Sequence, residues 1–154
     1  TSYGQRDYRD IITPLSWVKK FIFVGFEKSF YREYKFDSST EQDFAFILET
    51  DPEVIKWLRP VPLQFNIYWA NGARRYEPDF VVETADKIFM IETKALKDME
   101  AEEVQAKRAA AEEYCKQASA YTSLHGGKSW HYVIIAHDCV DRSHSFDYVI
   151  AKSI

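Results

Sequence analysis

The chain has 154 residues, of which 46% are hydrophobic and 16% aromatic. This length fits one domain with a substantial core, and the composition excludes a protein that is disordered throughout. The formal net charge of -4 and the sequence pI of about 5.6 argue against a strongly basic nucleic-acid binder. If the chain binds DNA, the positive charge that contacts the DNA must be clustered locally or supplied by another part of a larger protein.

The two cysteines, Cys115 and Cys139, have no metal-ligand spacing. Such sparse cysteine use is typical of a reducing compartment, so we expect a cytoplasmic protein. No segment approaches the ~20 apolar residues that a membrane span needs, and no signal-peptide pattern opens the chain, so we expect no membrane partner. The sequence begins with Thr1 rather than Met, and we expect an excised domain with more chain upstream.

In chain order, residues 1–15 are polar and aromatic, and we expect a linker or wrapping arm there, ahead of one domain at residues 16–154. Residues 18–26 indicate a strand, and residues 30–36 are a second candidate strand. A helix is expected to follow, through about residue 50.

This helix should begin at Ser38, because Ser38-x-x-Glu41 and Ser39-x-x-Gln42 both fit a capping box. After it, Pro52 in a first turn predicts a short helix over residues 51–58.

Three consecutive strands are expected to form a meander over residues 63–94. The first spans residues 63–69, and Asn71-Gly72 is a strong hairpin-turn signal that leads into the second, at residues 76–83. The third spans residues 87–94.

A long helix follows, from about residue 98 to residue 124, and Gly126-Gly127 ends it. Residues 130–136 are nearly all apolar, so we expect a strand at the centre of the sheet. Residues 146–151 are a candidate for the last strand. This order of elements predicts a mixed β-sheet with helices on its faces.

The second and third strands of the meander predict a hairpin. Paired around a two-residue loop, Thr84 faces Lys87 and Asp79 faces Glu92; a four-residue loop keeps this register, whereas a loop of three or five residues breaks it. Facing residues place their Cβ atoms roughly 4.5–5.5 Å apart, so two carboxylates destabilise the hairpin unless a hard divalent cation lies between them. Lys94 points to the same face as Glu92, which brings an ammonium beside the two carboxylates.

Pro78-Asp79 followed by Glu92-Thr93-Lys94 resembles the PD-(D/E)xK motif of the restriction-endonuclease-like nucleases. Neighbouring stretches resemble the nuclease domain of type III restriction enzymes, in the same order and over roughly residues 15–122; they are residues 36–45, 54–60, 76–80 and 91–94. No helicase or Walker-type segment is present in the sequence. The chain therefore resembles the isolated C-terminal nuclease domain of such an enzyme's restriction subunit.

The resemblance implies a restriction endonuclease-like fold, with a central mixed β-sheet flanked by α-helices. It also implies Mg²⁺-dependent cleavage of double-stranded DNA, with Mn²⁺ able to substitute. The implied partners are a helicase-like translocase upstream on the same polypeptide, through which alone ATP would be used, and a DNA methyltransferase subunit that reads the sequence.

Asp79 and Glu92 are expected to be metal ligands, because Mg²⁺ prefers oxygen donors. The resemblance implies that the backbone carbonyl of Thr93 is a third ligand. Lys94 would orient and help to deprotonate the attacking water, or stabilise the charge on the phosphate, and the sequence leaves these two roles open.

Glu41 lies on the inward stripe of its predicted helix, where a carboxylate must be paired or metal-bound. The resemblance implies that an acidic residue of this helix reaches the metal site, and the alternative is that Glu41 only completes the capping box. Four cations are candidate contacts to DNA phosphates, which give affinity without sequence preference. They are Lys107, Arg74, Arg75 and Lys97. For Lys107 the alternative is an i,i+4 ion pair with Glu103 on a solvated face, and for the other three it is plain surface charge.

Two other functions stay open at this stage. One is a catalytically silent docking or DNA-clamping module that kept the fold, and the presence of Asp79, Glu92 and Lys94 together argues against it. The other is a free-standing nuclease of the repair or resolvase type, which the sequence upstream of Thr1 would distinguish from a restriction subunit.

Overall fold

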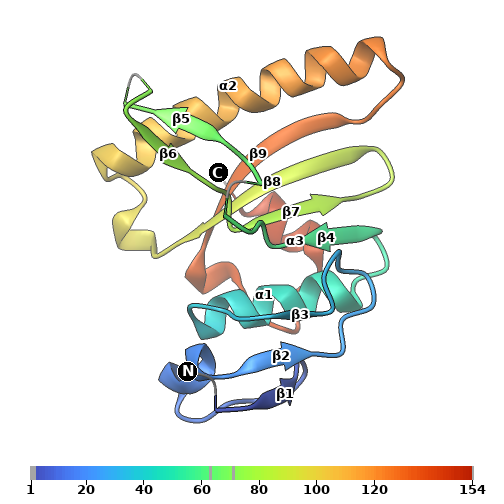
Figure 1. Ribbon diagram of the computed structural model, residues 1–154, viewed down its shortest axis with the longest axis vertical. Helices are drawn as coiled ribbons and strands as arrows, with labels where there is room; N and C mark the ends of the chain where they lie inside the picture. The colour runs from blue at the N-terminus through green and yellow to red at the C-terminus, as the bar shows by residue number, and fades with distance from the viewer. Residues whose placement is uncertain (1–2, 63, 71, 154) are drawn as a thin grey trace.

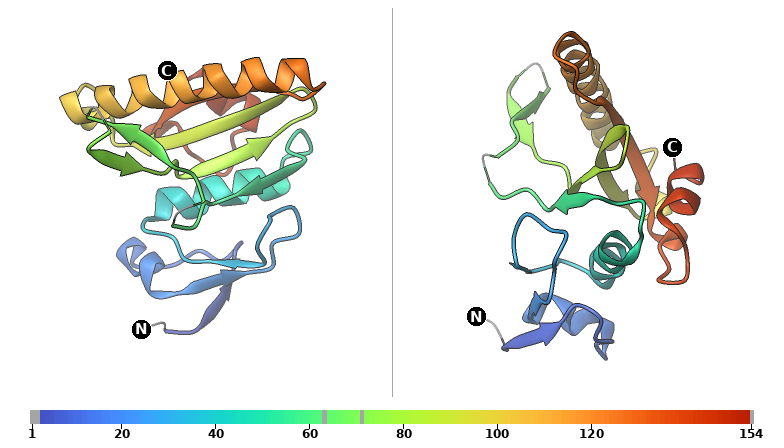
Figure 2. Two further views of the ribbon diagram at one scale, coloured as in Figure 1. Left: turned by 45° about the horizontal axis from the view of Figure 1, so that its top comes forward. Right: turned by 90° about the vertical axis from the view of Figure 1, so that its right-hand side faces the viewer.

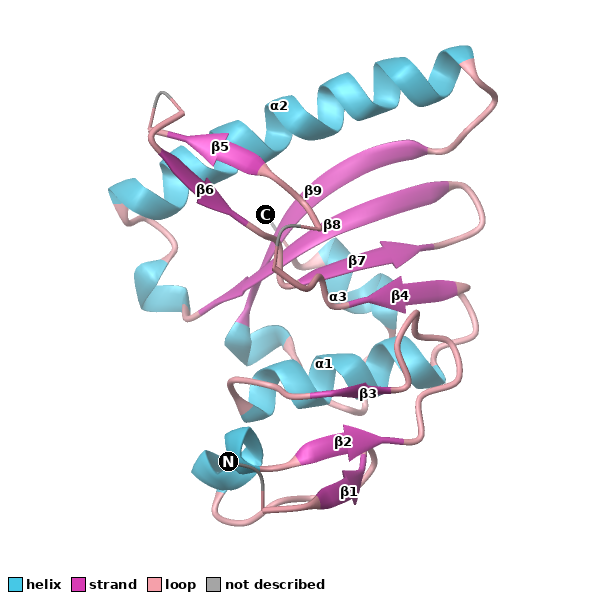
Figure 3. Cartoon of the chain, in the orientation of Figure 1, coloured by secondary structure: helices cyan, strands magenta, loops and turns pink. Residues whose placement is uncertain are grey.

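The computed structural model describes residues 3–62, 64–70 and 72–153, which form a mixed α/β fold around a four-stranded sheet in the order β4-β7-β8-β9 (Figures 1 and 3). β4 runs antiparallel to β7 and β7 to β8, whereas β9 runs parallel to β8. The strands of this central sheet are β4 (Lys56–Leu58), β7 (Phe80–Glu83), β8 (Lys87–Lys94) and β9 (Ser129–Ala136). The expected mixed sheet flanked by helices is confirmed.

Helices lie on both faces of the central sheet (Figure 2). Successive side chains of β8 point to opposite faces. Phe89 and Ile91 pack in one core with α1 and α3, and Met90 packs in another with α2. Glu92 and Lys94 follow Met90 at even spacing, so they lie on the α2 face. The helices are α1 (Ser39–Thr50), α2 (Glu102–Leu124) and α3 (Phe146–Ala151). Among the helices of the described residues, none is long and apolar enough to cross a bilayer.

A three-stranded sheet near the N-terminus lies at the end of the molecule opposite α2 (Figure 1). Its strands are β1 (Gln5–Asp7), β2 (Ile22–Val24) and β3 (Glu33–Tyr34), with β1 parallel and β3 antiparallel to β2. Phe23 and Phe36 share one buried core with Phe44 of α1, so this sheet packs against the body of the molecule.

A separate hairpin joins β5 (Ile67–Trp69) to β6 (Arg74–Tyr76) and stands away from the central sheet (Figure 2, right). Gly72 in its turn has a φ of +83°, a conformation that glycine adopts without strain. Ile67 anchors the hairpin in the core that contains Met90 and α2. The residues Leu63 and Asn71, which belong to the predicted strand and turn, lie outside the described residues.

Three expectations about individual elements are wrong. The short helix expected over residues 51–58 is a turn followed by β4, because Trp57 pairs with Val82 of β7 and its buried ring belongs to the core. The strand expected over residues 146–151 is helix α3, whose first turn is capped by the Ser145 hydroxyl accepting from the Tyr148 N–H. The strand at residues 130–136 exists but lies at the sheet edge, and it is apolar because helices cover it.

Other elements differ in extent. The predicted meander is broken at Pro78, so that β6 pairs with β5 and not with β7. Proline has no N–H to donate to a ladder, which explains the break. The strand expected over residues 18–26 is split into a 3₁₀ helix, η1 (Leu15–Lys20), and β2, and the strand expected over residues 30–36 is limited to β3. The long helix begins at Glu102, after a second 3₁₀ helix, η2 (Leu96–Asp98).

Candidate active site

The hairpin of β7 and β8 has the register that the sequence predicts. Phe80 pairs with Ile91, and the Thr84 N–H donates to the Lys87 carbonyl at 2.9 Å beside the turn. One step beyond Phe80, the same register places Asp79 level with Glu92.

Asp79 lies in the bend just before β7, after the buried Pro78. Its Oδ2 accepts two hydrogen bonds from Thr93, one from the backbone N–H at 2.9 Å and one from the hydroxyl at 3.1 Å. Both bonds hold the Asp79 carboxylate against the end of β8, next to Glu92.

Glu92 is a buried carboxylate, only 9% exposed. Its Oε1 lies 3.7 Å from the Lys94 Nζ, whereas its buried Oε2 has no hydrogen-bond partner among the residues that the structure describes. Burial raises the pKa of Glu92 to about 8, with a further contribution from the negative charge of Asp79, while the charges of Lys94 and Lys107 act in the opposite direction. Burial and the charge of Asp79 thus both disfavour the ionised form of Glu92.

Glu41 lies in the first turn of α1 and is 6% exposed. The Glu41 N–H donates to the Ser38 hydroxyl at 3.2 Å, which is one half of the expected capping box. The Glu41 carboxylate accepts from the Asp37 N–H at 2.7 Å and forms an ion pair with Arg59 at 3.1 Å. Burial raises the pKa of Glu41, the charge of Arg59 lowers it, and the charge of Asp79 raises it again. Asp79 thus acts electrostatically on Glu41 as well as on Glu92.

Lys107 approaches the same cluster from α2. Its ammonium forms an ion pair with Glu103 at 3.1 Å and lies 5.3 Å from the ring centroid of Trp69 and 5.8 Å from that of Tyr76. The β5–β6 hairpin thus holds Lys107 by cation–π contacts, at a place where its charge acts on Glu92.

The other three predicted DNA contacts lie farther out. Arg74 is exposed on β6, and its guanidinium is 5.5 Å from the ring centroid of Trp69, the ring that Lys107 also contacts. Arg75 is exposed and pairs with Tyr68 across the hairpin. Lys97 is exposed in η2, three residues after Lys94.

The donor set fits a hard cation. In the described part of the chain, no three His, Cys, Asp or Glu side chains form a ready-made metal cage. The Asp79 and Glu92 carboxylates and the Thr93 carbonyl are nevertheless hard oxygen donors of the kind that Mg²⁺ binds with part of its water shell. The unpartnered, buried Oε2 of Glu92 gives this set an oxygen that a cation would satisfy.

Arg59 also belongs to this cluster, although the sequence singled it out only as a member of the 54–60 stretch that resembles type III restriction enzymes. It follows β4, and its guanidinium contacts both Glu41 and Asp37. No sequence spacing predicts its contact with Glu41, because only the packing of β4 beside α1 brings the two residues together.

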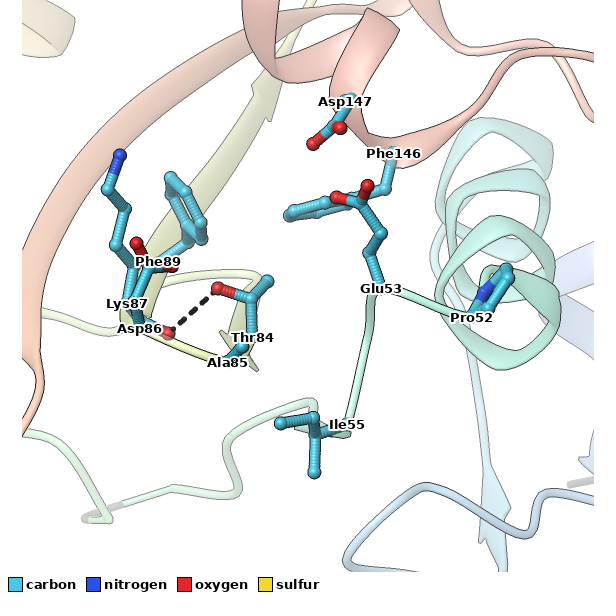
Figure 4. Close-up of a pocket in the computed structure, with 10 residues that line it drawn as sticks. All are labelled: Pro52, Glu53, Ile55, Thr84, Ala85, Asp86, Lys87, Phe89, Phe146 and Asp147. Atoms are coloured by element: carbon cyan, nitrogen blue, oxygen red, sulfur yellow. Dashed lines mark hydrogen bonds between the residues drawn. The ribbon is translucent and has the colours of Figure 1, made fainter.

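A cavity of about 680 Å³ lies elsewhere, between the β7–β8 turn, the turn after α1 and the start of α3 (Figure 4). Its lining includes Thr84 and Lys87, at the opposite end of β8 from Lys94. Seven residue steps of a strand separate Lys87 from Lys94, roughly 23 Å. This cavity is therefore not part of the candidate active site.

The mixed sheet flanked by helices is consistent with a restriction-endonuclease-like nuclease. A family model described as an endonuclease domain matches residues 27–131, which include α1, β4, β7, β8 and α2. The chain belongs to this endonuclease domain family. Comparison with curated proteins and with solved structures gave no match.

Proposed function

We propose that the chain is the Mg²⁺-dependent endonuclease domain of a type III restriction enzyme and that it hydrolyses phosphodiester bonds of double-stranded DNA. The observation that carries the proposal is the buried Glu92, with one unpartnered oxygen, beside Asp79 and Lys94 in a member of an endonuclease domain family. The type III assignment rests on the sequence resemblance.

In this proposal Asp79, Glu92 and the Thr93 carbonyl hold the cation, and Glu41 contributes a further carboxylate. Once bound, Mg²⁺ or Mn²⁺ supplies charge neutralisation at the phosphate and activation of the attacking water. The two bonds from Thr93 keep Asp79 in place for this task, because both fix its Oδ2 at the end of β8.

Lys94 is the residue that acts on the reacting atoms. Its Nζ lies 3.7 Å from the Glu92 Oε1, so it is close enough to the carboxylate pair to orient the attacking water or to stabilise negative charge on the phosphate. Its partly exposed side chain can reach a substrate on the open side of the site.

DNA affinity in this proposal comes from backbone contacts by Lys107, Arg74, Arg75 and Lys97, which carry no sequence preference. Sequence recognition would belong to a methyltransferase subunit and ATP use to a translocase on the same polypeptide. The net charge of -4 fits weak binding by this domain alone.

Cleavage of supercoiled plasmid DNA in Mg²⁺ or Mn²⁺ tests the proposal. Asp79→Asn and Glu92→Gln should each lower the nicking rate by at least about 100-fold, because each removes charge that the cation needs. Lys94→Ala should impair nicking while it leaves cation affinity largely intact. In the complete restriction complex, the first two variants should lose cleavage and keep ATP hydrolysis.

Asp86→Asn is the matched control, since Asp86 is an exposed carboxylate on the turn of the same hairpin. It should nick at the wild-type rate. If Asp79→Asn and Glu92→Gln also cut normally, the assigned site is wrong; if the wild-type protein binds neither cation, a silent DNA-clamping module is the better description.

A further inference from the structure

Arg59 is fixed in place by both charge and packing. One guanidinium nitrogen, Nη2, lies 3.1 Å from the Glu41 Oε1 and 3.0 Å from the Asp37 Oδ2, and the side chain is 16% exposed. The guanidinium carbon lies 5.9 Å from the Phe36 ring centroid and 5.7 Å from that of Phe80. Two aromatic rings and a buried carboxylate thus leave this long side chain little freedom.

These contacts connect the α1 part of the candidate site, which carries Glu41, with the β7 part, which carries Asp79. Glu41 comes from α1, whereas Phe80 directly follows Asp79 at the start of β7. Because Arg59 touches both, the distance between the Glu41 carboxylate and the Asp79 segment depends on it.

Charge balance requires a cation at this position. A carboxylate as buried as Glu41 is stable in its charged form only when it is paired. The charge of Asp79 acts on both Glu41 and Glu92, so the carboxylates repel one another. Arg59 forms the ion pair that offsets this repulsion at Glu41.

The Arg59 guanidinium is engaged with groups of the protein itself. The Nη1 of Arg59 is buried and, within the described residues, has no hydrogen-bond partner. A DNA phosphate cannot reach a buried nitrogen without rearrangement of the surrounding rings. The bonds that Arg59 makes through Nη2 go to carboxylates instead.

We propose that Arg59 is a positioning residue, which holds the Glu41 carboxylate toward Asp79 and Glu92 so that Glu41 can serve as a cation ligand. The inference rests on the proposed function, since it assigns Arg59 a task at the same cation site. It requires that the effect of Arg59 on cation affinity is transmitted through Glu41.

A double-mutant cycle between Arg59→Met and Glu41→Gln tests this requirement, with Mn²⁺ affinity measured by calorimetry and kcat and KM measured for plasmid nicking. Methionine keeps the apolar contact with the two rings and removes the charge. Each single variant should weaken Mn²⁺ binding by about 10-fold, since Arg59→Met removes the group behind a ligand and Glu41→Gln removes the charge of the ligand itself. The double variant should be no weaker than either. In the two single variants and the double variant, KM for DNA should stay within about 2-fold of the wild-type value.

Arg59→Lys should restore most of the Mn²⁺ affinity, because it returns a positive charge beside Glu41. If thermal melting shows that Arg59→Met does not fold, the Mn²⁺ affinity of Arg59→Lys still tests the role of the charge. Arg6→Met is the matched control: Arg6 forms an ion pair with Asp10 and packs over Phe21 in the N-terminal sheet, and its loss should not change Mn²⁺ affinity.

Two results would overturn the inference while the proposed function stands. Losses of Mn²⁺ affinity that multiply in the double variant would show that Arg59 and Glu41 act independently. A raised KM for DNA in Arg59→Met with unchanged Mn²⁺ affinity would make Arg59 a DNA contact. In contrast, a wild-type protein that binds no Mn²⁺ would remove the proposed function itself.

Discussion

Glu92 is a carboxylate whose ionised form is disfavoured by its surroundings. Its carboxylate is buried, one oxygen has no partner within the described chain, and the neighbouring Asp79 carries like charge. The protein keeps this unfavourable arrangement although a neutral side chain would fit the same place. Such a conflict between stability and local charge is typical of functional sites.

Glu92→Gln should therefore stabilise the metal-free protein at alkaline pH. The folded-state pKa of Glu92 is raised from 4.5 to about 8, so its contribution to stability is present below about pH 4.5 and is lost as the pH rises toward 8. The Tm of the variant, measured in EDTA, should exceed that of the wild type by a margin that is small near pH 4.5 and large at pH 8.5.

Addition of Mg²⁺ at pH 8.5 should reduce the Tm difference between Glu92→Gln and the wild type, because the cation should bind and stabilise the wild type. A margin that is the same at both pH values would show that Glu92 titrates normally.

The positions of Asp79, Glu92 and Lys94 could be predicted from the sequence because strand side chains alternate with a period of two and the short turn fixes the register. The ion pair of Glu41 with Arg59 could not be predicted in the same way. These residues are brought together by the packing of α1 beside β4, which no local pattern encodes.

The N-terminus of α1 shows how a local signal positions a site residue. Ser38 was predicted to begin this helix, and its hydroxyl accepts from the Glu41 N–H. Ser38→Ala should lower the free energy of unfolding by about 1 kcal/mol, because it leaves a helix N–H without its cap.

Urea denaturation measures this loss. Ser123→Ala serves as the control, since Ser123 is an exposed serine within α2 and its replacement should have little effect or slightly stabilise the helix. Equal stability of Ser38→Ala and the wild type would show that the cap contributes nothing.

The elements that were predicted wrongly are short ones, whose conformation depends on distant contacts. Residues 56–58 are extended because they pair with β7 and because the Trp57 indole donates to Glu49 of α1 at 3.1 Å. Residues 146–151 form a helix whose buried residues, Phe146 and Val149, are three apart. Two buried residues in so short a segment do not distinguish a helical period from the alternation of a strand. The long helix and the 87–94 strand were predictable because their patterns extend over many residues.

At the scale of the whole molecule, three cations lie close together at one edge of the candidate site although the net charge of the chain is negative. The hydrogen bond from Lys107 lowers the pKa of Glu103, and the charges of Arg74 and Lys94 act in the same direction. Three cations from α2, β6 and β8 therefore gather around this carboxylate. These three side chains form a local cluster of positive charge on a chain that is acidic as a whole.

Arg142 joins parts of the molecule that are far apart in sequence. It forms an ion pair with Asp43 of α1 at 2.7 Å and donates to the carbonyls of Arg9 and Asp10 beyond β1. Arg142→Ala should cost about 2 kcal/mol, because these bonds involve a charged donor. Amide hydrogen exchange in Arg142→Ala should accelerate, relative to the wild type, more in β1 and β2 than in β8.

Arg9→Ala is the corresponding control, since the Arg9 side chain is exposed and contacts its chain neighbours Asp7 and Tyr8. Its effect on stability should be much smaller than that of Arg142→Ala. Uniform acceleration of exchange in all strands of Arg142→Ala would show that the N-terminal sheet and the central sheet unfold as one unit.

The location of the bound cation is the most direct test of the account. Mn²⁺ broadens the NMR signals of nearby nuclei, so its addition to the metal-free protein should first broaden the backbone amides of Phe80, Thr93 and Lys94. The amides of the Thr84–Lys87 turn, roughly 23 Å along β8, should change much less, and Asp79→Asn should abolish the effect. Broadening that is strongest at that turn, or that survives in Asp79→Asn, would contradict a cation site between Asp79 and Glu92.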